Sequence, residues 1–316
     1  MKRHRDNCVA RAAYGNIQQA AAVHMAEQNH NQRIRIVAYN FLSGGSRKRN
    51  GHWSRVVRAF APELVLAQEC RPPVDSPGER FRPDPSNALL WHSVVGRRWG
   101  SALFARSGPV SAIPVAGYDG WVVGGEVQRT EWSNGRPLRV FSIHAPAGER
   151  GYIRTMHEIL DRIALARAGA DVILGGDFNV VVGYRLPHER LKVTRGERGI
   201  LDRLVQEFGL VSCWQAAHPN RPLAQTLRWS ANRQAPYHCD GIFVPSSWLD
   251  RLVSCRVVRG SRWNALSDHN PVVAEFRSVF NRHICKEEEQ SEASLSSASR
   301  SPRELRHIKD TSAGFG

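Results

Sequence analysis

The stretch Val172-Ile173-Leu174-Gly175-Gly176-Asp177-Phe178-Asn179 leads from an apolar run into an acid and an amide two positions apart. The apolar run predicts a buried strand, and side chains alternate between the faces of a strand, so Asp177 and Asn179 are expected to share one face. A second polar cluster, Ser267-Asp268-His269-Asn270-Pro271, lies near the C-terminal end of the same domain. An acid next to an imidazole, combined with an acid and an amide, supplies a metal ligand, a general base and groups that hold a water. The two clusters together are typical of metal-assisted cleavage of a phosphoester.

Three further apolar runs also end in a polar side chain. Residues 33–40 alternate basic and apolar side chains and end at Asn40, residues 64–69 end at Glu69, and residues 138–143 are followed by His144. In layered α/β folds, ligand sites collect at the carboxyl ends of strands, where the loops carry function and the sheet holds them in place. We therefore expect these polar groups to converge on one site.

Three segments have the apolar spacing of amphipathic helices. Apolar residues recur at three- and four-residue intervals in residues 52–60, 153–163 and 200–208, which end near Pro62, Gly169 and Gly209. This spacing places the apolar side chains on one face of each helix. Helical crossovers between strands, followed by hairpin-like pieces, favour a single layered α/β domain.

In this order the fragments resemble the endonuclease/exonuclease/phosphatase superfamily, whose members include deoxyribonuclease I, exonuclease III, sphingomyelinases, deadenylases and inositol polyphosphate phosphatases. The resemblance extends over roughly residues 33–276, and its motifs are weak singly but specific in combination. It implies a four-layered α/β/β/α sandwich, in which two packed mixed β-sheets are flanked by helices.

The resemblance also implies a metal centre built from oxygen ligands. Glu69, in the Gln-Glu motif, becomes the principal ligand of Mg²⁺, with Asp268 as a further ligand. Asn40 is the amide of the first motif and contacts the metal or the phosphate. Hard Mg²⁺, for which Mn²⁺ is the expected substitute, prefers a few carboxylate oxygens and retained water to a cage of histidine and cysteine.

The other matched residues would act on the water and on the phosphate. Asp177 and Asn179 match the Gly-Asp-x-Asn motif that places the nucleophilic water and a phosphate oxygen. His269 would serve as a base or as a contact to the phosphate; as a base it starts neutral, and Asp240 fixes its tautomer. His144 matches a histidine that assists the leaving oxygen or binds phosphate in the deoxyribonuclease I and sphingomyelinase branches.

His144 also distinguishes the branches of the superfamily. The exonuclease III and abasic-site endonuclease branch usually has a tyrosine there and Asn-x-Asn-Gly after the first strand, whereas this chain has Tyr39-Asn40-Phe41-Leu42. The sequence therefore favours the broader branch that holds deoxyribonuclease I, sphingomyelinases and deadenylases. In deoxyribonuclease I the histidine has an acidic partner on a neighbouring strand. Residues 99–104 contain no acid, so Glu126 and Glu131 are the candidates for that partner.

The chain of 316 residues has a formal net charge of +15, and the excess of basic residues lies within residues 33–285. A basic surface attracts polyanions, and such binding weakens as salt rises. The leading hypothesis is a Mg²⁺-dependent phosphodiesterase, either an endonuclease or an exonuclease, that acts on DNA or RNA. One alternative is a phosphomonoesterase or phospholipase of the same superfamily, acting on inositol phosphates or sphingomyelin, whose basic surface would bind anionic lipid headgroups. Another is a catalytically silent binding module.

We expect one catalytic domain over residues 33–285, a disordered N-terminal extension over residues 1–32 and a disordered tail rich in Ser, Glu and Arg over residues 286–316. The six scattered cysteines contain no Cys-x-x-Cys pair, which argues against a zinc site or a dense disulfide scaffold. No membrane-spanning apolar stretch or secretory leader is evident in the sequence, so a cytoplasmic location is expected. The oligomeric state stays open.

Residues 72–87 and 183–199 are expected to be loops. The second contains Arg185, Arg190, Lys192, Arg195 and Arg198, and it is either a clamp on the phosphate backbone or a solvated surface loop. Residues 44–51 add Arg47, Lys48 and Arg49 near the expected mouth of the site. Trp229 is expected to be a core aromatic, with base stacking as the functional alternative.

Overall fold

Two six-stranded mixed sheets form the centre of the protein, seen in a computed structural model that describes residues 33–44, 50–76, 78–128, 132–133, 135–189 and 191–278. The expectations for residues 1–32 and 286–316, and for Arg47, Lys48, Arg49, Glu131 and Arg190, lie outside these ranges. In the described part of the chain, no helix is long and apolar enough to cross a membrane.

The first sheet has the order β11-β12-β1-β2-β4-β3, and the second has the order β5-β6-β7-β8-β10-β9. The strands of the first sheet are β1 (Arg33–Asn40), β2 (Leu64–Cys70), β3 (Ala88–Ser93), β4 (Gly100–Ala105), β11 (Leu252–Val257) and β12 (Val272–Arg277). Those of the second are β5 (Val110–Ile113), β6 (Val122–Val127), β7 (Leu138–His144), β8 (Asp171–Asp177), β9 (Leu210–Ser212) and β10 (Asp240–Pro245).

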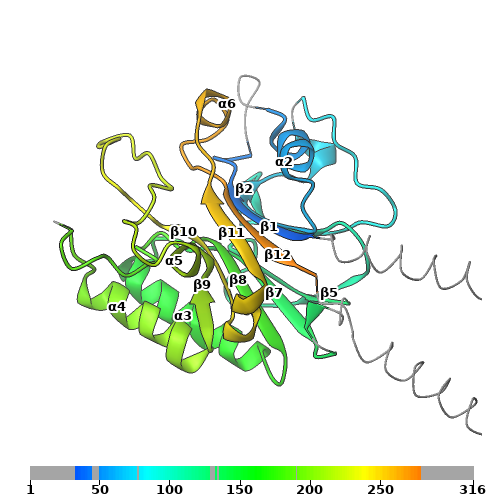
Figure 1. Ribbon diagram of the computed structural model, residues 1–316. Helices are drawn as coiled ribbons and strands as arrows, with labels where there is room; N and C mark the ends of the chain where they lie inside the picture. Colours follow the sequence, from blue (N-terminus) through cyan, green and yellow to red (C-terminus); the bar gives the residue numbers. More distant parts are fainter. Residues whose placement is uncertain are drawn as a thin grey trace, which may run out of the picture. The chain divides into compact units, whose positions relative to one another are not determined.

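The helices are α2 (His52–Phe60), α3 (Gly151–Ala166), α4 (Arg195–Asp202), α5 (Cys213–Ala217) and α6 (Ser261–Asn264). Two 3-10 turns, Pro73–Asp75 and Ser246–Arg251, and a π-helical turn, Arg203–Glu207, complete the described elements. Figure 1 shows α2 on the side of the first sheet, and α3 and α4 together on the side of the second.

Alternate residues of the central strands pack in different layers. Ile36 and Ala38 of β1 lie in the core between the two sheets, whereas Val37 and Tyr39 pack in the core that includes Trp53 of α2. On the other side, Val140 of β7 joins the core between the sheets, and its neighbour Phe141 packs with the apolar face of α3. Strands buried on both faces read as nearly continuous apolar runs. The four-layered α/β/β/α sandwich expected from the sequence is therefore confirmed.

The strand registers bring the polar strand ends together. β1 and β2 are parallel with Asn40 opposite Gln68, and β7 and β8 are parallel with His144 opposite Asp177. Each parallel pair is connected by a helix, α2 in the first case and α3 in the second. β10 runs antiparallel to β8 with Asp240 opposite Asp177, so its first residue joins the same edge.

The predicted loop 183–199 ends earlier than expected, because α4 begins at Arg195. Thr194 and Glu197 form a capping box, in which Thr194 Oγ1 accepts from the Glu197 backbone N–H and Glu197 Oε2 accepts from the Thr194 backbone N–H. The Thr-x-x-Glu spacing was a usable signal for a helix start. The helix expected over residues 200–208 is thus the end of α4 followed by the π-helical turn.

The two glycines before Asp177 allow the sheets to approach closely. A Cβ at Gly175 would lie 2.6 Å from Leu66 Cδ1 of the first sheet. Gly176 has a φ of 137°, and a Cβ there would lie 2.1 Å from the carbonyl oxygen of Ile143. The glycines of this motif therefore serve the packing that presents Asp177.

Gly176→Ala is expected to destabilise the protein by roughly 3 kcal/mol or more, because a Cβ would overlap backbone at a φ that L-residues rarely adopt. Urea unfolding measures the change. Gly199→Ala in α4 is the control, since its Cβ would meet nothing closer than 3.7 Å and a helix favours alanine. Equal stabilities of the two variants would contradict the steric argument.

His238 gives the fold an acid-sensitive point. Its side chain is fully buried, Nδ1 lies 2.7 Å from the Ala224 carbonyl oxygen, and Nε2 has no hydrogen-bond partner among the described residues. Burial lowers the pKa of His238 to about 4, although the bond to Ala224 and the charge of Asp240 oppose this shift.

Stability is expected to fall by up to about 3 kcal/mol as pH drops from 6.5 towards 4, because only the unfolded chain takes up this proton in that window. Urea unfolding of wild type and His238→Gln at pH 7 and pH 5 measures the effect. The variant should lose less stability on acidification, whereas His92→Gln, which changes an exposed histidine, should behave like wild type. An identical loss in all three proteins would contradict the assignment.

Candidate active site

The predicted site residues meet at a cavity of about 540 Å³ at the carboxyl ends of the parallel strands. Six of them line it: Glu69, His144, Asp177, Asn179, Asp268 and His269. Asn40 and Asp240 are almost fully buried and form hydrogen bonds to the lining residues. All eight residues singled out in the sequence are thus brought to one place, from both sheets.

Asn40 connects two carboxylates that belong to different sheets. Its Nδ2 donates to Glu69 Oε1 at 3.2 Å and to Asp177 Oδ2 at 3.0 Å. Its own Oδ1 accepts from the backbone N–H of Leu42 at 2.9 Å. Because both ends of the amide are engaged, this geometry supports a positioning role for Asn40, and its direct contact with metal or phosphate remains a prediction.

Glu69 is presented by an irregular end of β2. The pairing of β2 with β4 shifts register between Ala67 and Cys70, and Glu69 has a φ of 46°. Such strained residues cost on the order of 1–3 kcal/mol and cluster at functional sites. Glu69 Oε2 accepts from the backbone N–H and the hydroxyl of Ser43, at 2.7 and 3.0 Å. Both carboxylate oxygens are therefore held in place.

His144 faces the same two carboxylates. Its Nε2 lies 3.6 Å from Glu69 Oε1 and 3.9 Å from Asp177 Oδ2. The imidazole ring packs against Trp99 and Trp121, with ring centroids 5.7 and 5.1 Å away. These contacts hold the ring with Nε2 near the cavity.

The acidic partner sought for His144 is not found among the described residues. The Nδ1 of His144 is buried without a hydrogen bond. Glu126 instead forms an ion pair with Arg139, with 3.0 Å between Oε2 and Nε. Glu131, the other candidate, lies outside the described residues.

Asp240 and His269 form the pair that the sequence implied. Nδ1 of His269 lies 3.0 and 2.9 Å from the two carboxylate oxygens of Asp240, which leaves Nε2 at 3.7 Å from Asp177 Oδ2. Asp240 is held in turn by its backbone N–H, which donates to Thr226 Oγ1 at 3.1 Å. Sequence reasoning missed Thr226, which is placed by backbone hydrogen bonds with the distant residues Tyr237 and Asn270.

The charges around His269 favour its protonated form. Burial by itself would lower the pKa of His269, but the carboxylates of Asp240 and Asp177 outweigh it and raise the pKa to about 10. These carboxylates favour the imidazolium, and the neutral base expected from the sequence stays a prediction. A bound cation would oppose this shift, because it adds positive charge near the same carboxylates.

Asp177 is the point on which the other groups converge. Burial raises the pKa of this carboxyl, the charge of His269 opposes the shift, and Asp240 adds to it. Its Oδ1 accepts from the backbone N–H of Asn179 at 3.0 Å, while Asn179 Nδ2 donates to the Ala145 carbonyl oxygen at 2.9 Å. Asn179 adopts a left-handed φ of 53°, a conformation that asparagine tolerates better than most residues.

The donor set fits a hard divalent cation. Glu69, Asp177 and Asp268 place carboxylates on one cavity, and Asp268 Oδ1 is buried without a hydrogen-bond donor among the described residues. A buried carboxylate oxygen without a partner is costly unless a cation or water satisfies it. Oxygen donors of this kind suit Mg²⁺ or Mn²⁺.

A second group of metal-binding residue types suits a metal less well. Ligand atoms of Asp177, Cys239, Asp240 and His269 lie within 4.8 Å of one another. Burial and the neighbouring carboxylates raise the pKa of the Cys239 thiol well above its ordinary value, so the thiolate that binds soft metals is disfavoured. The Nδ1 of His269 is already engaged by Asp240. This group therefore serves to orient the imidazole.

Aromatic side chains line the mouth of the cavity and were only partly anticipated. Trp229 is 47% exposed, so the expectation of a core aromatic is wrong. It meets Tyr237 edge-on, with ring centroids 5.8 Å apart, and both line the cavity together with Tyr152. The lack of apolar periodicity around Trp229 indicates that this residue is exposed. No pattern in the sequence indicates that Tyr152 and Tyr237 line the cavity.

The basic segment beyond Asn179 is partly structural. The Arg185 guanidinium is buried, forms an ion pair with Glu189 at 3.1 Å, and donates to the Pro236 carbonyl oxygen at 3.0 Å. Lys192 Nζ donates to the Pro187 carbonyl oxygen at 2.7 Å. Arg185 therefore stabilises the loop, and its guanidinium group is not available to bind a phosphate.

Solved structures of nucleases share this fold. One is an AP endonuclease from Archaeoglobus fulgidus, at 17% identity and a TM-score of 0.57 over 77% of this chain and 99% of that one. The endonuclease domain of TRAS1, a telomere-specific non-LTR retrotransposon, gives 16% identity and a TM-score of 0.54 over 77% and 98%. The AP endonuclease LMAP from Leishmania major gives 14% identity and a TM-score of 0.57 over 78% of this chain and 88% of that one. At these identities the likeness concerns the fold.

A comparison with curated proteins gave no match. Residues 37–269 match the endonuclease/exonuclease/phosphatase family, and this span contains every residue of the cavity described above. Fold, site and family point to a hydrolase of the nuclease and phosphatase type. The chain belongs to the endonuclease/exonuclease/phosphatase family.

Proposed function

We propose that this protein is a Mg²⁺-dependent phosphodiesterase that hydrolyses the backbone of DNA or RNA by in-line attack of water. The observation that carries the proposal is the convergence on Asp177 Oδ2, which lies 3.0 Å from Asn40 Nδ2, 3.7 Å from His269 Nε2 and 3.9 Å from His144 Nε2. A carboxylate between two imidazoles is suited to hold a water against a phosphate that the rings contact.

Each side chain then has a defined task. Glu69 and Asp268 would hold Mg²⁺ or its substitute Mn²⁺, with Asn40 positioning Glu69. The cation would supply positive charge that neutralises the phosphate oxygens. Asp177 and Asn179 would orient the attacking water, with Asp177 accepting its proton.

The two imidazoles would act on the phosphate. His269, oriented by Asp240, presents Nε2 to a phosphate oxygen. His144 presents Nε2 near the same point and would donate to the leaving oxygen. The bond from phosphorus to that oxygen breaks as the bond to the water oxygen forms.

Nucleic acid is the favoured substrate because of the charge of the protein. The formal net charge is +15, and a basic surface raises the local concentration of a polyanion. The exposed Trp229 at the cavity mouth adds a face on which a base can stack. A cytoplasmic location remains an expectation of the sequence.

Incubation with plasmid, single-stranded oligonucleotide, RNA, sphingomyelin and inositol phosphates, each with Mg²⁺ or EDTA, tests the proposal. We expect cleavage of DNA or RNA that EDTA abolishes and that His269→Ala reduces at least about a hundredfold. Hydrolysis of only sphingomyelin or inositol phosphate would refute a nuclease. Activity that persists in EDTA would refute the role of the metal.

A further inference from the structure

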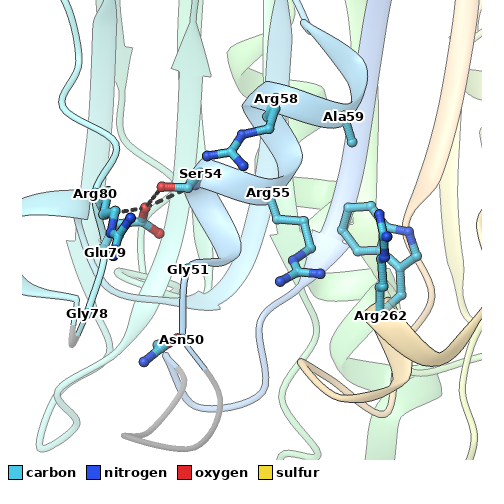
Figure 2. A pocket seen from close by; sticks show the side chains of 11 residues that line it. Asn50, Gly51, Ser54, Arg55, Arg58, Ala59, Gly78, Glu79, Arg80 and Arg262 are labelled. Atoms are coloured by element: carbon cyan, nitrogen blue, oxygen red, sulfur yellow. Dashed lines mark hydrogen bonds between the residues drawn. The ribbon is translucent and has the colours of Figure 1, made fainter.

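A second hollow lies outside the catalytic cavity, between α2, residues 78–80 and α6. It has a volume of about 940 Å³, and four arginines and one glutamate are among the residues that line it. Figure 2 shows Arg55 and Arg58 projecting from α2, with Arg80 on one flank and Arg262 on the other. We call these four residues and the space between them the arginine groove.

In the part of the chain that the structure describes, no acid neutralises the positive charge of the arginine groove. Its acid, Glu79, is only 6% exposed and accepts from the backbone N–H groups of Trp53 and Ser54 at 2.9 and 3.0 Å. It also accepts from the Arg80 backbone N–H at 2.8 Å. The carboxylate therefore satisfies the start of α2 and the turn beside it, and leaves the guanidinium groups free of an acid.

Arginines elsewhere in the protein behave differently. Arg35 forms an ion pair with Glu275 at 3.0 Å, and Arg203 pairs with Asp161 at 2.8 Å and with Glu207 at 2.7 Å. Across the described ranges, no ion pair or side-chain hydrogen bond involves the guanidinium groups of the arginine groove. Four like charges around one hollow repel one another, so the arrangement favours an anionic occupant.

Aromatic packing and a hydrogen bond hold the wall of the arginine groove beside Arg262 in place. Trp263, next to Arg262, stacks on Phe60 with ring centroids 5.1 Å apart and an interplanar angle of 11°. Tyr39 meets the same indole edge-on at 5.7 Å. The His52 Nε2 lies 3.1 Å from the Leu266 carbonyl oxygen, which ties the start of α2 to the end of the α6 segment.

The arginine groove shares no lining residue with the catalytic cavity, but short stretches of chain connect the two. Tyr39, which packs on Trp263, directly precedes Asn40. Trp263 lies five positions before Asp268, so their Cα atoms are at most about 18 Å apart. At about 3.4 Å per nucleotide of a duplex strand, that distance corresponds to at most about five nucleotides.

We propose that the arginine groove binds the phosphodiester backbone of the nucleic acid whose scissile phosphate occupies the catalytic cavity, an inference that rests on the proposed function. Planar guanidinium groups bind phosphate oxygens in a bidentate manner. A strand that extends about five nucleotides beyond the cut is therefore long enough to span the distance from Asp268 to Trp263.

The test is the salt dependence of binding by the variant R55Q/R58Q/R262Q, measured on a 20-base-pair duplex in an Asp177→Asn background. If each guanidinium contacts one phosphate, the slope of log Kd against log salt falls by about 2 to 3. The Kd at about 0.1 M salt rises at least about tenfold. With Asp177 intact, R55Q/R58Q/R262Q should hydrolyse the small substrate bis(4-nitrophenyl) phosphate at the wild-type kcat. The variant R55K/R58K/R262K, which keeps the positive charges, should keep most of the salt slope.

The control R162Q/R221Q/R277Q removes the same charge from exposed arginines outside both cavities. An equal change of the salt slope in the control would refute backbone binding by the arginine groove. An unchanged slope in R55Q/R58Q/R262Q, with a wild type that cleaves the duplex, would refute it as well. Binding that depends on the arginine groove without any cleavage would support it and refute the proposed function. If R55Q/R58Q/R262Q lost binding to phosphatidylserine vesicles while its salt slope on nucleic acid stayed unchanged, the arginine groove would be a membrane contact and the proposal would be refuted.

Discussion

Asp177→Asn is expected to lower kcat on nucleic acid by about a thousandfold or more. The substitution keeps the shape of the side chain but removes the negative charge that two imidazoles and the Asn40 amide share. Loss of a positioned base typically costs 10²–10⁴-fold, and the amide also changes how the neighbouring rings are held. Single-turnover cleavage of a labelled duplex measures the effect.

The control for this change is Asp119→Asn, which alters an exposed aspartate outside the cavity and should retain wild-type activity. The folded state should tolerate Asp177→Asn, because a buried carboxylate of raised pKa is replaced by a neutral group of similar size. Urea unfolding checks this. A variant that keeps a tenth of the wild-type kcat would contradict the role of Asp177.

Glu69→Gln is expected to remove both the response to Mg²⁺ and at least about 99% of the activity. Glu69 Oε2 is held by Ser43 and its Oε1 is positioned by Asn40, so one neutral amide in its place presents a weaker ligand with the same shape. A cation that binds only the folded state adds about 2.7 kcal/mol of stability at a hundred times its Kd. The wild type should therefore show a rise in Tm with Mg²⁺ that the variant lacks.

The Tm readout does not depend on activity, so it separates loss of metal binding from loss of chemistry. Glu149→Gln, at an exposed glutamate, should keep the full Mg²⁺ response. An equal rise in Tm for wild type and Glu69→Gln would place the cation elsewhere. Titration with Mn²⁺ should give the same pattern, since the same oxygen donors would bind it.

The strands and their polar ends could be predicted from the sequence because buried strands carry continuous apolar runs with an abrupt polar end. Asn40, Glu69, His144 and Asp177 were found in this way, and parallel pairing explains why they meet. The start of α4 is also encoded locally, in the spacing of Thr194 and Glu197.

Other features depend on contacts between distant segments and leave no local pattern. The left-handed conformation of Glu69 follows a break in the pairing of β2 with β4, and Thr226 reaches Asp240 only after a long loop has folded back. The exposure of Trp229 depends on its loop and on Tyr237. The arginine groove likewise arises where α2 and α6, over 200 positions apart, become neighbours.

The bridge from Asn40 to Glu69 and Asp177 spans the two halves of the sandwich, so the reacting groups are aligned only while the halves keep their native spacing. A swollen, molten form with intact helices and strands would therefore be inert. On gentle heating, turnover should disappear before far-ultraviolet circular dichroism changes, which would make hydrolysis a more sensitive reporter of tight packing than any spectrum of the backbone.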